Sequence, residues 1–177
     1  YGEKGVLCLF SDSTNSHNPG FTKSETVVGK TFDTLFDLAK GRVIMSTFSS
    51  NVHRIFQAME RGVKHGRKIC VIGRSMERNV ETNRALGYVD IDERHFIEVH
   101  EIPKYPDHEI LIITTGSQGE TMAALNRMAT DEHRHVKLKP NDTVIISASA
   151  IPGNEASVSS LMNKLMKAGC TVRYKEF

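Results

Sequence analysis

The sequence predicts an α/β fold: a doubly wound, mostly parallel sheet with helices on both faces, as in Rossmann-like proteins. Short apolar runs alternate with longer segments whose apolar residues recur at helical spacing. The connections between these segments are short, which suits parallel strands joined by crossover helices. With 177 residues, the chain is one domain, or one piece of a larger protein, and is long enough to bury a full core.

Residues 4–10 form the first predicted strand, which ends at the polar stretch SDSTN. Residues 22–25 (TKSE) fit a capping box, in which a hydroxyl and a carboxylate each accept a free N–H at a helix start. We expect this helix to run to about Ala39 and Gly41 to end it. Its predicted apolar face comprises Val27, Val28, Phe32, Leu35, Phe36 and Leu38.

The next two strands are predicted over residues 42–47 and 68–72, both of them apolar runs. Between them, a helix is expected from about Asn51 to Gly66, and a more polar helix follows the second strand over residues 75–85. The apolar residues spaced as one buried face of the first of these helices are Val52, Ile55, Phe56, Met59 and Val63.

Residues 89–106 contain two prolines and mixed charges, so we expect a loop with a short strand over residues 96–99. Residues 110–114 (ILIIT) predict a buried strand, and the helix after it is expected to begin at Glu120 and to run to about residue 129. The stretch 133–139 alternates polar and apolar residues, which is typical of an exposed edge strand.

The last part of the chain repeats the pattern, with strands predicted over residues 143–147 and 171–174. Between them, Asn154 is expected to cap a helix that ends at Gly169. The predicted core face of this helix comprises Val158, Leu161, Met162, Leu165 and Met166.

The composition excludes several classes of protein. The net charge of +2 is too small to indicate a nucleic-acid partner by itself. No run approaches the length of a membrane span, and no signal peptide opens the chain. Cys8, Cys70 and Cys170 lie in or beside apolar strands without paired spacing, so we expect buried, reduced thiols in a cytoplasmic protein. The abrupt start in a strand suggests a piece of something longer.

Polar turns follow four of the predicted strands. In a parallel sheet these turns all lie at the carboxyl edge, where such folds bind ligands. Each contains small residues and leads into a helix, whose free N–H groups and dipole attract anions. We therefore expect a ligand groove at this edge, better suited to phosphates and sugars than to base-specific recognition. The four stretches are VIMSTFSSNVHRIF, CVIGRSMERNV, EILIITTGSQGETMAAL and VIISASAIPGNEASV.

The first candidates leave alternatives open. Asp12 fits a metal ligand or a residue that caps its own turn, and spacing alone favours the turn. Arg74 fits a phosphate fork and a structural ion pair equally well. His133 and His135 share one side of the predicted edge strand and have no carboxylate nearby, so we interpret them as a solvated face. Ser50, Asn51 and His53 fit either a phosphate or ribose contact or an ordinary helix cap.

The stretch GSQGE places Ser117, Gln118 and Glu120 in the turn after the strand at residues 110–114. Its two glycines form a weak phosphate motif, because the lysine of a P-loop is missing. The stretch SASAIPGN adds hydroxyls, a glycine and a helix cap: Ser147, Ser149, Gly153 and Asn154.

Seven stretches, in this order, resemble bacterial ribonuclease J: GVLCLFSDSTN, PGFTKSE, STFSSNVHR, VIGRSM, TTGSQGE, ALNRMA and SASAIPGNE. Members of that family are metallo-β-lactamase-fold nucleases with a β-CASP domain as an insertion. The resemblance implies that residues 1–15 are the end of a metallo-β-lactamase strand with a metal-ligand loop. Residues 16–177 would then be the β-CASP domain, truncated before its C-terminal phosphate-binding segment.

The resemblance further implies an enzyme with two Zn²⁺ ions, or Mn²⁺ or Mg²⁺, that cuts RNA endonucleolytically and degrades it 5′ to 3′ from a 5′ monophosphate, in RNA decay and processing. Asp12 would be a metal ligand and catalytic through the metal only. The implied partners are a second copy or a paralogue subunit and other RNA-decay proteins. The implied pocket for the terminal phosphate comprises Ser147, Ser149, Gly153 and Asn154. The implied RNA groove comprises Ser50, Asn51, His53, Arg74, Ser117, Gln118 and Glu120.

Two departures from the family pattern qualify these expectations. The family's histidine-rich zinc motif belongs before Tyr1 and its SGH-type phosphate segment after Phe177, so we expect the fragment alone to be inactive and without zinc. Thr121 and Ala150 stand where typical members have proline, which favours looser loops and leaves open a low-activity paralogue that binds RNA and the active subunit. A third alternative is an independent phospho-ligand-binding α/β domain.

Overall fold

The computed structural model describes residues 1–13, 16–17, 19–21 and 24–174. In these ranges the chain forms a five-stranded, all-parallel sheet in the order β2-β3-β1-β4-β5. The strands are β1 (Val43–Ser46), β2 (Lys68–Ile72), β3 (Ile110–Thr114), β4 (Thr143–Ile146) and β5 (Thr171–Tyr174). The prediction of a doubly wound parallel α/β fold is confirmed.

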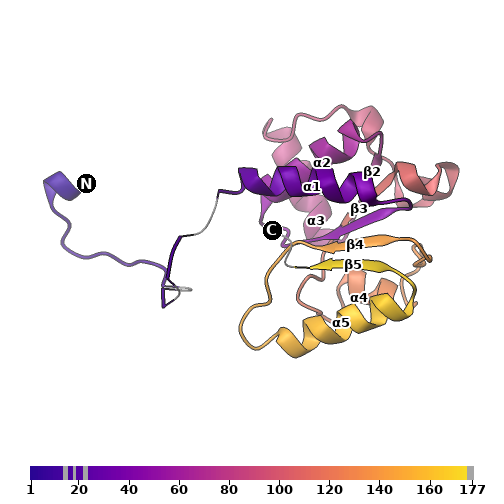
Figure 1. Ribbon diagram of the computed structural model, residues 1–177. Helices are drawn as coiled ribbons and strands as arrows, with labels where there is room; N and C mark the ends of the chain where they lie inside the picture. The colour runs from indigo at the N-terminus through magenta and orange to yellow at the C-terminus, as the bar shows by residue number, and fades with distance from the viewer. Residues whose placement is uncertain (14–15, 18, 22–23, 175–177) are drawn as a thin grey trace.

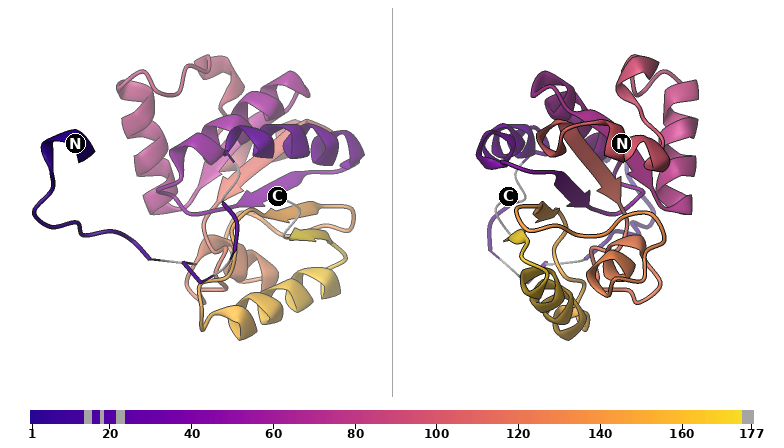
Figure 2. Two further views of the ribbon diagram at one scale, coloured as in Figure 1. Left: turned by 60° about the vertical axis from the view of Figure 1, so that its left-hand side comes forward. Right: turned by 90° about the vertical axis from the view of Figure 1, so that its right-hand side faces the viewer.

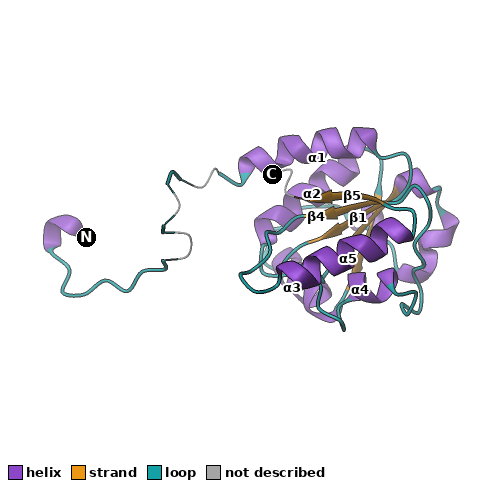
Figure 3. Cartoon of the chain, turned by 60° about the horizontal axis from the view of Figure 1, so that its bottom comes forward, coloured by secondary structure: helices purple, strands orange, loops and turns teal. Residues whose placement is uncertain are grey.

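Helices cover both faces of the sheet, as the ribbon in Figure 1 and the two further views in Figure 2 show. One layer contains α1 to α3 and the other contains α4 and α5, which lie in front of the strands in Figure 3. The α-helices are α1 (Thr26–Leu38), α2 (Val52–Lys64), α3 (Arg74–Ala85), α4 (Ala124–Ala129) and α5 (Glu155–Lys167). Short 3₁₀ helices are η1 (Gly2–Lys4), η2 (Glu93–His95), η3 (Val99–Lys104) and η4 (Asp107–Glu109).

The central strand β1 shows why the sheet is buried on both faces. Its residues alternate in direction, so Val43 and Met45 pack against the α1–α3 layer while Ile44 packs against the α4–α5 layer. All three are fully buried. The same alternation divides β3, where Leu111 joins the first layer and Ile112 the second. Two separate apolar cores therefore hold the sheet between its helices.

The chain leaves two neighbouring strands toward opposite faces. After β1 it enters α2 in one layer, and after β3 it enters α4 in the other layer. Because β1 and β3 are hydrogen-bonded neighbours, their carboxyl ends form the topological switch point of the sheet. Parallel α/β folds bind ligands in the crevice at such a point.

The connection from β2 to β3 passes around the outer edge of the sheet. The only trace of the predicted strand over residues 96–99 in the described chain is an isolated parallel bridge between Ile69 and Phe96, with the Ile97 N–H donating to the Ile69 carbonyl at 2.9 Å. The strand does not continue because Val99 already begins η3, which contains Pro103. Proline has no N–H to donate to a sheet ladder.

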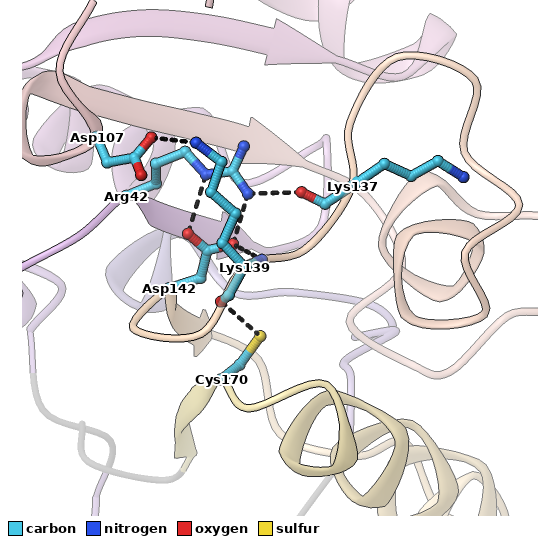
Figure 4. Close-up of polar contacts among 6 residues, drawn as sticks. All are labelled: Arg42, Asp107, Lys137, Lys139, Asp142 and Cys170. Carbon is cyan, nitrogen blue, oxygen red and sulfur yellow. Dashed lines mark hydrogen bonds and ion pairs between the residues drawn. The ribbon is translucent and has the colours of Figure 1, made fainter. Parts of the chain in front are cut away.

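An ion pair at the amino edge joins β1 to the turn before β4 (Figure 4). Arg42 donates from Nε and Nη2 to the two carboxylate oxygens of Asp142 at 2.9 and 2.6 Å, and from Nη2 to the Lys137 carbonyl at 2.7 Å. Both charged side chains are almost fully buried. The backbone N–H of Lys139 also donates to Asp142, at 2.8 Å, so the carboxylate is well satisfied.

A second buried arginine ties the amino ends of β1 and β3 together. Arg67 donates to the carbonyls of Ala39, Gly41 and Ile110 at 2.9 to 3.0 Å. Burial lowers the pKa of Arg67 to about 10, so its guanidinium stays protonated at neutral pH. The structural framework thus lies at the amino edge, and the opposite edge is left for function.

The predicted strand over residues 4–10 is wrong. Gly2–Lys4 form η1, and residues 5–13 lie apart from the sheet (Figure 1). The side chains of Leu7, Leu9 and Phe10 are exposed. A strand needs a hydrogen-bonded neighbour, and among the described residues no strand lies beside this segment. Cys8 is consequently exposed rather than buried as expected.

The other two cysteines are buried and reduced, as predicted. Burial raises the pKa of the Cys70 thiol to about 12 and that of the Cys170 thiol to about 11. Both thiols therefore stay protonated and unreactive at neutral pH, which fits a role in packing.

Several predicted boundaries and faces also need correction. Residues 133–139 form no strand, because side chains bind backbone groups of this segment. Arg42 donates to the Lys137 carbonyl, and the His133 ring accepts the Val136 N–H. Of the predicted capping box, residues 22–23 lie outside the described residues, and the side chain of Glu25, the N-cap residue of α1, makes no capping hydrogen bond. The expected helix start at Glu120 lies at Ala124 instead. Three residues assigned to helical core faces are exposed: Val27, Leu38 and Met166.

In the described residues, no helix combines the length and the apolar character that crossing a lipid bilayer requires.

Candidate nucleic-acid interface

Four turns meet at the carboxyl edge of the sheet, one after each of the strands β1 to β4. Hydrogen bonds of the sheet continue into them: the Thr47 N–H donates to the Thr114 carbonyl at 3.3 Å, and the Ser147 N–H to the Ser46 carbonyl at 2.8 Å. These bonds fix the start of the turn after β1 beside the end of β3, and the start of the turn after β4 beside the end of β1. The sequence predicted this convergence from the strand order of a parallel fold.

Gln118 joins the turn after β3 to the turn after β4. Its side-chain Nε2 donates to the Ser149 carbonyl at 3.0 Å, and its Oε1 accepts the Ile151 N–H at 2.8 Å and the Asn154 side-chain N–H at 3.4 Å. Gln118 is 4% exposed, so its amide is already used inside the protein. It positions the loop at residues 148–154 and offers little surface to a ligand itself.

The rest of the GSQGE turn is closed against α5. Gly119 has φ +74°, and a Cβ there would lie 2.5 Å from the Ser157 carbonyl oxygen, so glycine is required by this close approach. Glu120 accepts the Gln118 N–H at 3.0 Å, and Ser117 is buried. Glu120 itself is exposed. The predicted phosphate motif is thus mainly a packed turn that supports its neighbours.

The turn after β4 begins in a buried position. The Ser147 carbonyl accepts the Thr47 hydroxyl at 3.0 Å and Arg54 Nη1 at 2.9 Å, and the buried Ser147 hydroxyl has no hydrogen-bond partner among the described residues. Arg54 also forks onto the Glu25 carboxylate at 3.0 and 2.5 Å. Sequence reasoning missed Arg54, which lies next to His53 and gave no separate signal.

Beyond Ser147 the loop opens to solvent. Ser149 and Gly153 are exposed, and Asn154 precedes α5 but makes no side-chain cap. The Gly153 N–H donates to Glu155 at 2.8 Å, and the Ala150 N–H donates to the Tyr174 hydroxyl at 3.1 Å, which ties the loop to β5.

The turn after β1 separates its three candidates. Asn51 caps α2 by accepting the Arg54 N–H at 3.3 Å, and Ser50 is exposed beside it. His53 is exposed too, but it lines a small apolar cavity with Phe56 and Tyr88 on the α2 side. Ser50 therefore lies on the shared edge, and His53 faces another direction.

An arginine-lined cleft adjoins these turns beyond the ends of β2 and β3. It has a volume of about 660 Å³, and Arg74 lines it together with Arg78, Arg127 and His133. Sequence reasoning singled out only Arg74. Arg78 follows one helical turn later, a spacing that places both on one face of α3. His133 is 8% exposed, so its interpretation as part of a solvated face is wrong.

The described residues do not form a metal centre by themselves. No group of three or more His, Cys, Asp or Glu side chains among them is placed to hold an ion. Asp12 is exposed on the segment that lies apart from the sheet (Figure 1). One carboxylate does not complete a metal site, since Zn²⁺ takes three or four protein ligands.

Comparison with known proteins identifies the family. The sequence profile of the family described as "Ribonuclease J, beta-CASP domain" matches residues 40–165. The chain belongs to the ribonuclease J β-CASP family. The matched range of this β-CASP domain runs from the residues before β1 into α5 and includes all four turns of the carboxyl edge.

Individual relatives agree with the β-CASP assignment. Ribonuclease J of Helicobacter pylori (strain ATCC 700392 / 26695) is 64% identical over 177 residues, which is 100% of this chain and 26% of that protein. Ribonuclease J 1 of Streptococcus pyogenes is 50% identical over 97% of the chain and 30% of that protein. Ribonuclease J2 of Bacillus subtilis is 42% identical over 99% of the chain and 32% of that protein. The chain thus spans about a quarter to a third of the length of these relatives.

Proposed function

We propose that this chain is the RNA-binding part of a metal-dependent ribonuclease J that acts as an endonuclease and as a 5′-to-3′ exonuclease in RNA decay and processing. The observation that carries the proposal is the family match over residues 40–165, because that range contains all four turns of the carboxyl edge. In the proposal these turns form one wall of the RNA channel. Hydroxyls and backbone groups suit the phosphates and riboses of any RNA sequence.

The residues of the wall have two kinds of role in this proposal. Exposed groups bind RNA, among them Ser50, Ser149 and the backbone at Gly153, the last two near the 5′ monophosphate. Buried groups hold the loops in position, chiefly Gln118 with its hydrogen bonds to residues 149–154. A loop that is already held in its binding conformation loses less conformational entropy when it binds a ligand.

Residues 1–15 belong to the metallo-β-lactamase domain in this proposal, and residues 16–177 to the β-CASP domain. The exposed apolar side chains of Leu7, Leu9 and Phe10 support such an assignment, because they would be covered by a partner surface. Asp12 then supplies one carboxylate ligand, and the remaining ligands come from outside the described residues. The metal, proposed to be a pair of Zn²⁺ ions, would activate water and stabilise the charge that develops on the phosphate.

The low-activity paralogue is the second candidate, suggested by Thr121 and Ala150 in place of proline. Identity to the protein named Ribonuclease J in Helicobacter pylori is 64%, and identity to Ribonuclease J2 of Bacillus subtilis is 42%. We keep the catalytic form as the first candidate, because the higher identity is to a protein named Ribonuclease J. In either form we propose a second copy or a paralogue as a subunit partner and a cytoplasmic location.

The proposal is tested by RNA degradation with the full-length protein. A 5′-monophosphorylated RNA is incubated with the protein and Mn²⁺ or Zn²⁺, beside an Asp12→Ala variant and an Asp90→Ala control on an exposed residue of the β-CASP domain. Metal-dependent decay that the Asp12 variant loses and the Asp90 variant keeps is the expected result. RNA binding without decay by the unmutated protein would contradict catalysis and leave the paralogue.

A further inference from the structure

The cleft beside α3 and α4 has the dimensions of a small-molecule site. Its volume of about 660 Å³ lies within the range of about 300–1,000 Å³ that is usual for ligand pockets. It opens at the carboxyl ends of β2 and β3, beyond Ile72 and Thr115. Two elements far apart in the sequence build it, the start of α3 and the segment from Met122 to His133.

Positive charge gathers in this cleft without a carboxylate among its lining residues. Arg74 and Arg78 are exposed, and neither guanidinium makes a hydrogen bond or an ion pair with another described residue. Among the described residues, the Arg127 guanidinium donates only to the Glu132 carbonyl, at 3.4 Å. The nearby Glu77 carboxylate accepts the Gly73 N–H at 3.0 Å and lines a different cavity. Three guanidinium groups with free donors are a site for an anion with several oxygen atoms.

His133 adds a donor of fixed tautomer. Its Nδ1 accepts the Val136 N–H at 3.1 Å and the His135 N–H at 3.4 Å, so the proton of the neutral ring lies on Nε2. The ring is more than nine-tenths buried and lines the cleft, and Nε2 has no partner among the described residues. The backbone N–H of His133 also donates to the Arg127 carbonyl at 2.9 Å, which holds the two residues side by side.

The first turn of α3 contributes backbone donors. The Gly73 side has no capping side chain, and Glu77 accepts only the Gly73 N–H, so the N–H groups of Arg74, Ser75 and Met76 have no acceptor among the described residues. Gly73 precedes them with φ +116°, and a Cβ there would meet the Thr115 hydroxyl at 3.1 Å. Free N–H groups at the positive end of a helix bind phosphate.

Apolar surface distinguishes this cleft from a site for a bare ion. Met122 is 83% exposed at its rim, and Ala123 and Ala124 lie beside it. A flexible thioether and small side chains suit the face of a base or a ribose. The ligand class is therefore an organic phosphate with a flat or ring-shaped body.

We propose that this cleft binds a phosphorylated nucleotide, with its phosphate held by Arg74, Arg78, Arg127 and the Nε2–H of His133. The nucleotide is either one unit of an RNA strand or a free nucleotide, since both present the same phosphate chemistry. The proposal deepens the proposed function and rests on it for RNA as the source.

Binding to the full-length protein tests the proposal. The probes are uridine 5′-monophosphate, a short oligouridine with a 5′ phosphate, and inorganic phosphate, each titrated by calorimetry in the absence of added metal. The variants are Arg78→Gln and Arg127→Gln. Arg94→Gln is the matched control, because this exposed arginine carries the same charge and lies outside the cleft.

We expect each cleft variant to weaken nucleotide binding about tenfold, the effect of losing one charge-assisted contact. We also expect each to reduce the salt dependence of oligouridine binding by about one released counterion. Arg94→Gln should change neither. In the unmutated protein, nucleotide binding should slow hydrogen exchange in residues 73–79 and 122–133. This protection locates the ligand at the cleft, which a change in overall charge would not do.

The probes separate the two sources. Tight binding of oligouridine alone supports an RNA strand as the ligand, and equal binding of the mononucleotide supports a free nucleotide. Equal weakening by all three variants, or an unchanged affinity in both cleft variants, would overturn the proposal. RNA decay is measured on the same proteins, so failure of the cleft leaves the proposed function standing if decay persists. Nucleotide binding at the cleft without any decay would contradict the proposed function alone.

Discussion

The side-chain amide of Gln118 donates a hydrogen bond to the Ser149 carbonyl at 3.0 Å and so links the turns after β3 and β4. The two strands are not hydrogen-bonded neighbours, because β1 lies between them. The link therefore spans the switch point of the sheet at its carboxyl edge. It makes two loops that are 31 residues apart one structural unit.

Gln118→Met should loosen this unit without altering the sheet. Methionine keeps the volume but leaves the Ser149 carbonyl and the Ile151 N–H without partners, at a cost of about 1–3 kcal/mol in the free energy of unfolding. Hydrogen exchange at residues 148–154 should become faster. Gln57→Met, which removes one hydrogen bond to the Glu25 carbonyl, is the control and should leave that loop unchanged. Unaltered exchange in the Gln118 variant would show that the loop is held by other contacts.

Gly119→Ala should destabilise the protein more than Gly153→Ala. Both glycines have positive φ, +74° and +97°, so both substitutions strain the backbone by about 1 kcal/mol or more. Only at Gly119 would the new Cβ lie 2.5 Å from the Ser157 carbonyl oxygen, whereas nothing lies within 4 Å at Gly153. Urea unfolding measures the difference, and equal losses in the two variants would contradict the close contact with α5.

The buried ion pair at the amino edge should outweigh the exposed pair beside it. Arg42→Met leaves the Asp142 carboxylate buried and without its main partner, so the free energy of unfolding should fall by about 3–5 kcal/mol. Lys139→Met breaks an ion pair with Asp107 whose side chains are 50% and 43% exposed, and it should cost no more than about 1 kcal/mol. Similar losses in urea unfolding would argue against burial as the cause.

His133 should make stability depend on pH. Burial, followed by the charges of Arg127, His135 and Lys137, lowers the pKa of His133. The unfolded chain, with a histidine pKa near about 6.5, then binds a proton more readily than the folded one, so stability falls as the pH drops through this value. His133→Asn keeps an acceptor for the Val136 N–H and should remove this part of the pH dependence. His135→Asn, at an exposed position, is the control.

Urea unfolding between about pH 7.5 and pH 5.5, the range around the ordinary histidine pKa, measures this effect. A His133→Asn variant that loses as much stability on acidification as the unmutated protein would contradict the assignment of the effect to this ring.

Two strands, β2 and β3, were predictable because local pattern and tertiary structure agree there. Residues 68–72 and 110–114 are apolar runs between polar turns, and both strands have those bounds. Residues 4–10 are an equally apolar run, but a strand also needs a neighbour, which no sequence pattern supplies. At 133–139 the alternation suits a strand, yet contacts from Arg42 and within the segment bind its backbone groups. Neither the missing neighbouring strand nor the contact from Arg42 can be read from the local pattern.

The candidate site was predictable as an edge but not in its details. Parallel topology places every turn after a strand together, so Arg74, Gln118 and Ser149 could be assigned to one region. Which of them is exposed depends on hydrogen bonds that the sequence does not reveal, as burial of Gln118 shows. The arginine-lined cleft needed Arg127 and His133, which lie more than 50 residues from Arg74 and meet it only in the folded chain.

Mapping RNA on the protein tests the central claim, that the carboxyl edge of the sheet faces RNA. The full-length protein is cross-linked by light to 5′-monophosphorylated RNA that contains 4-thiouridine, and the modified peptides are identified by mass spectrometry. We predict cross-links in the turns and helix starts of that edge: residues 48–53, 73–79, 115–127 and 147–154. The amino edge, with Arg42 and residues 137–142, also carries positive charge and serves as an internal control. Cross-links at the amino edge, and none at the carboxyl edge, would contradict the account.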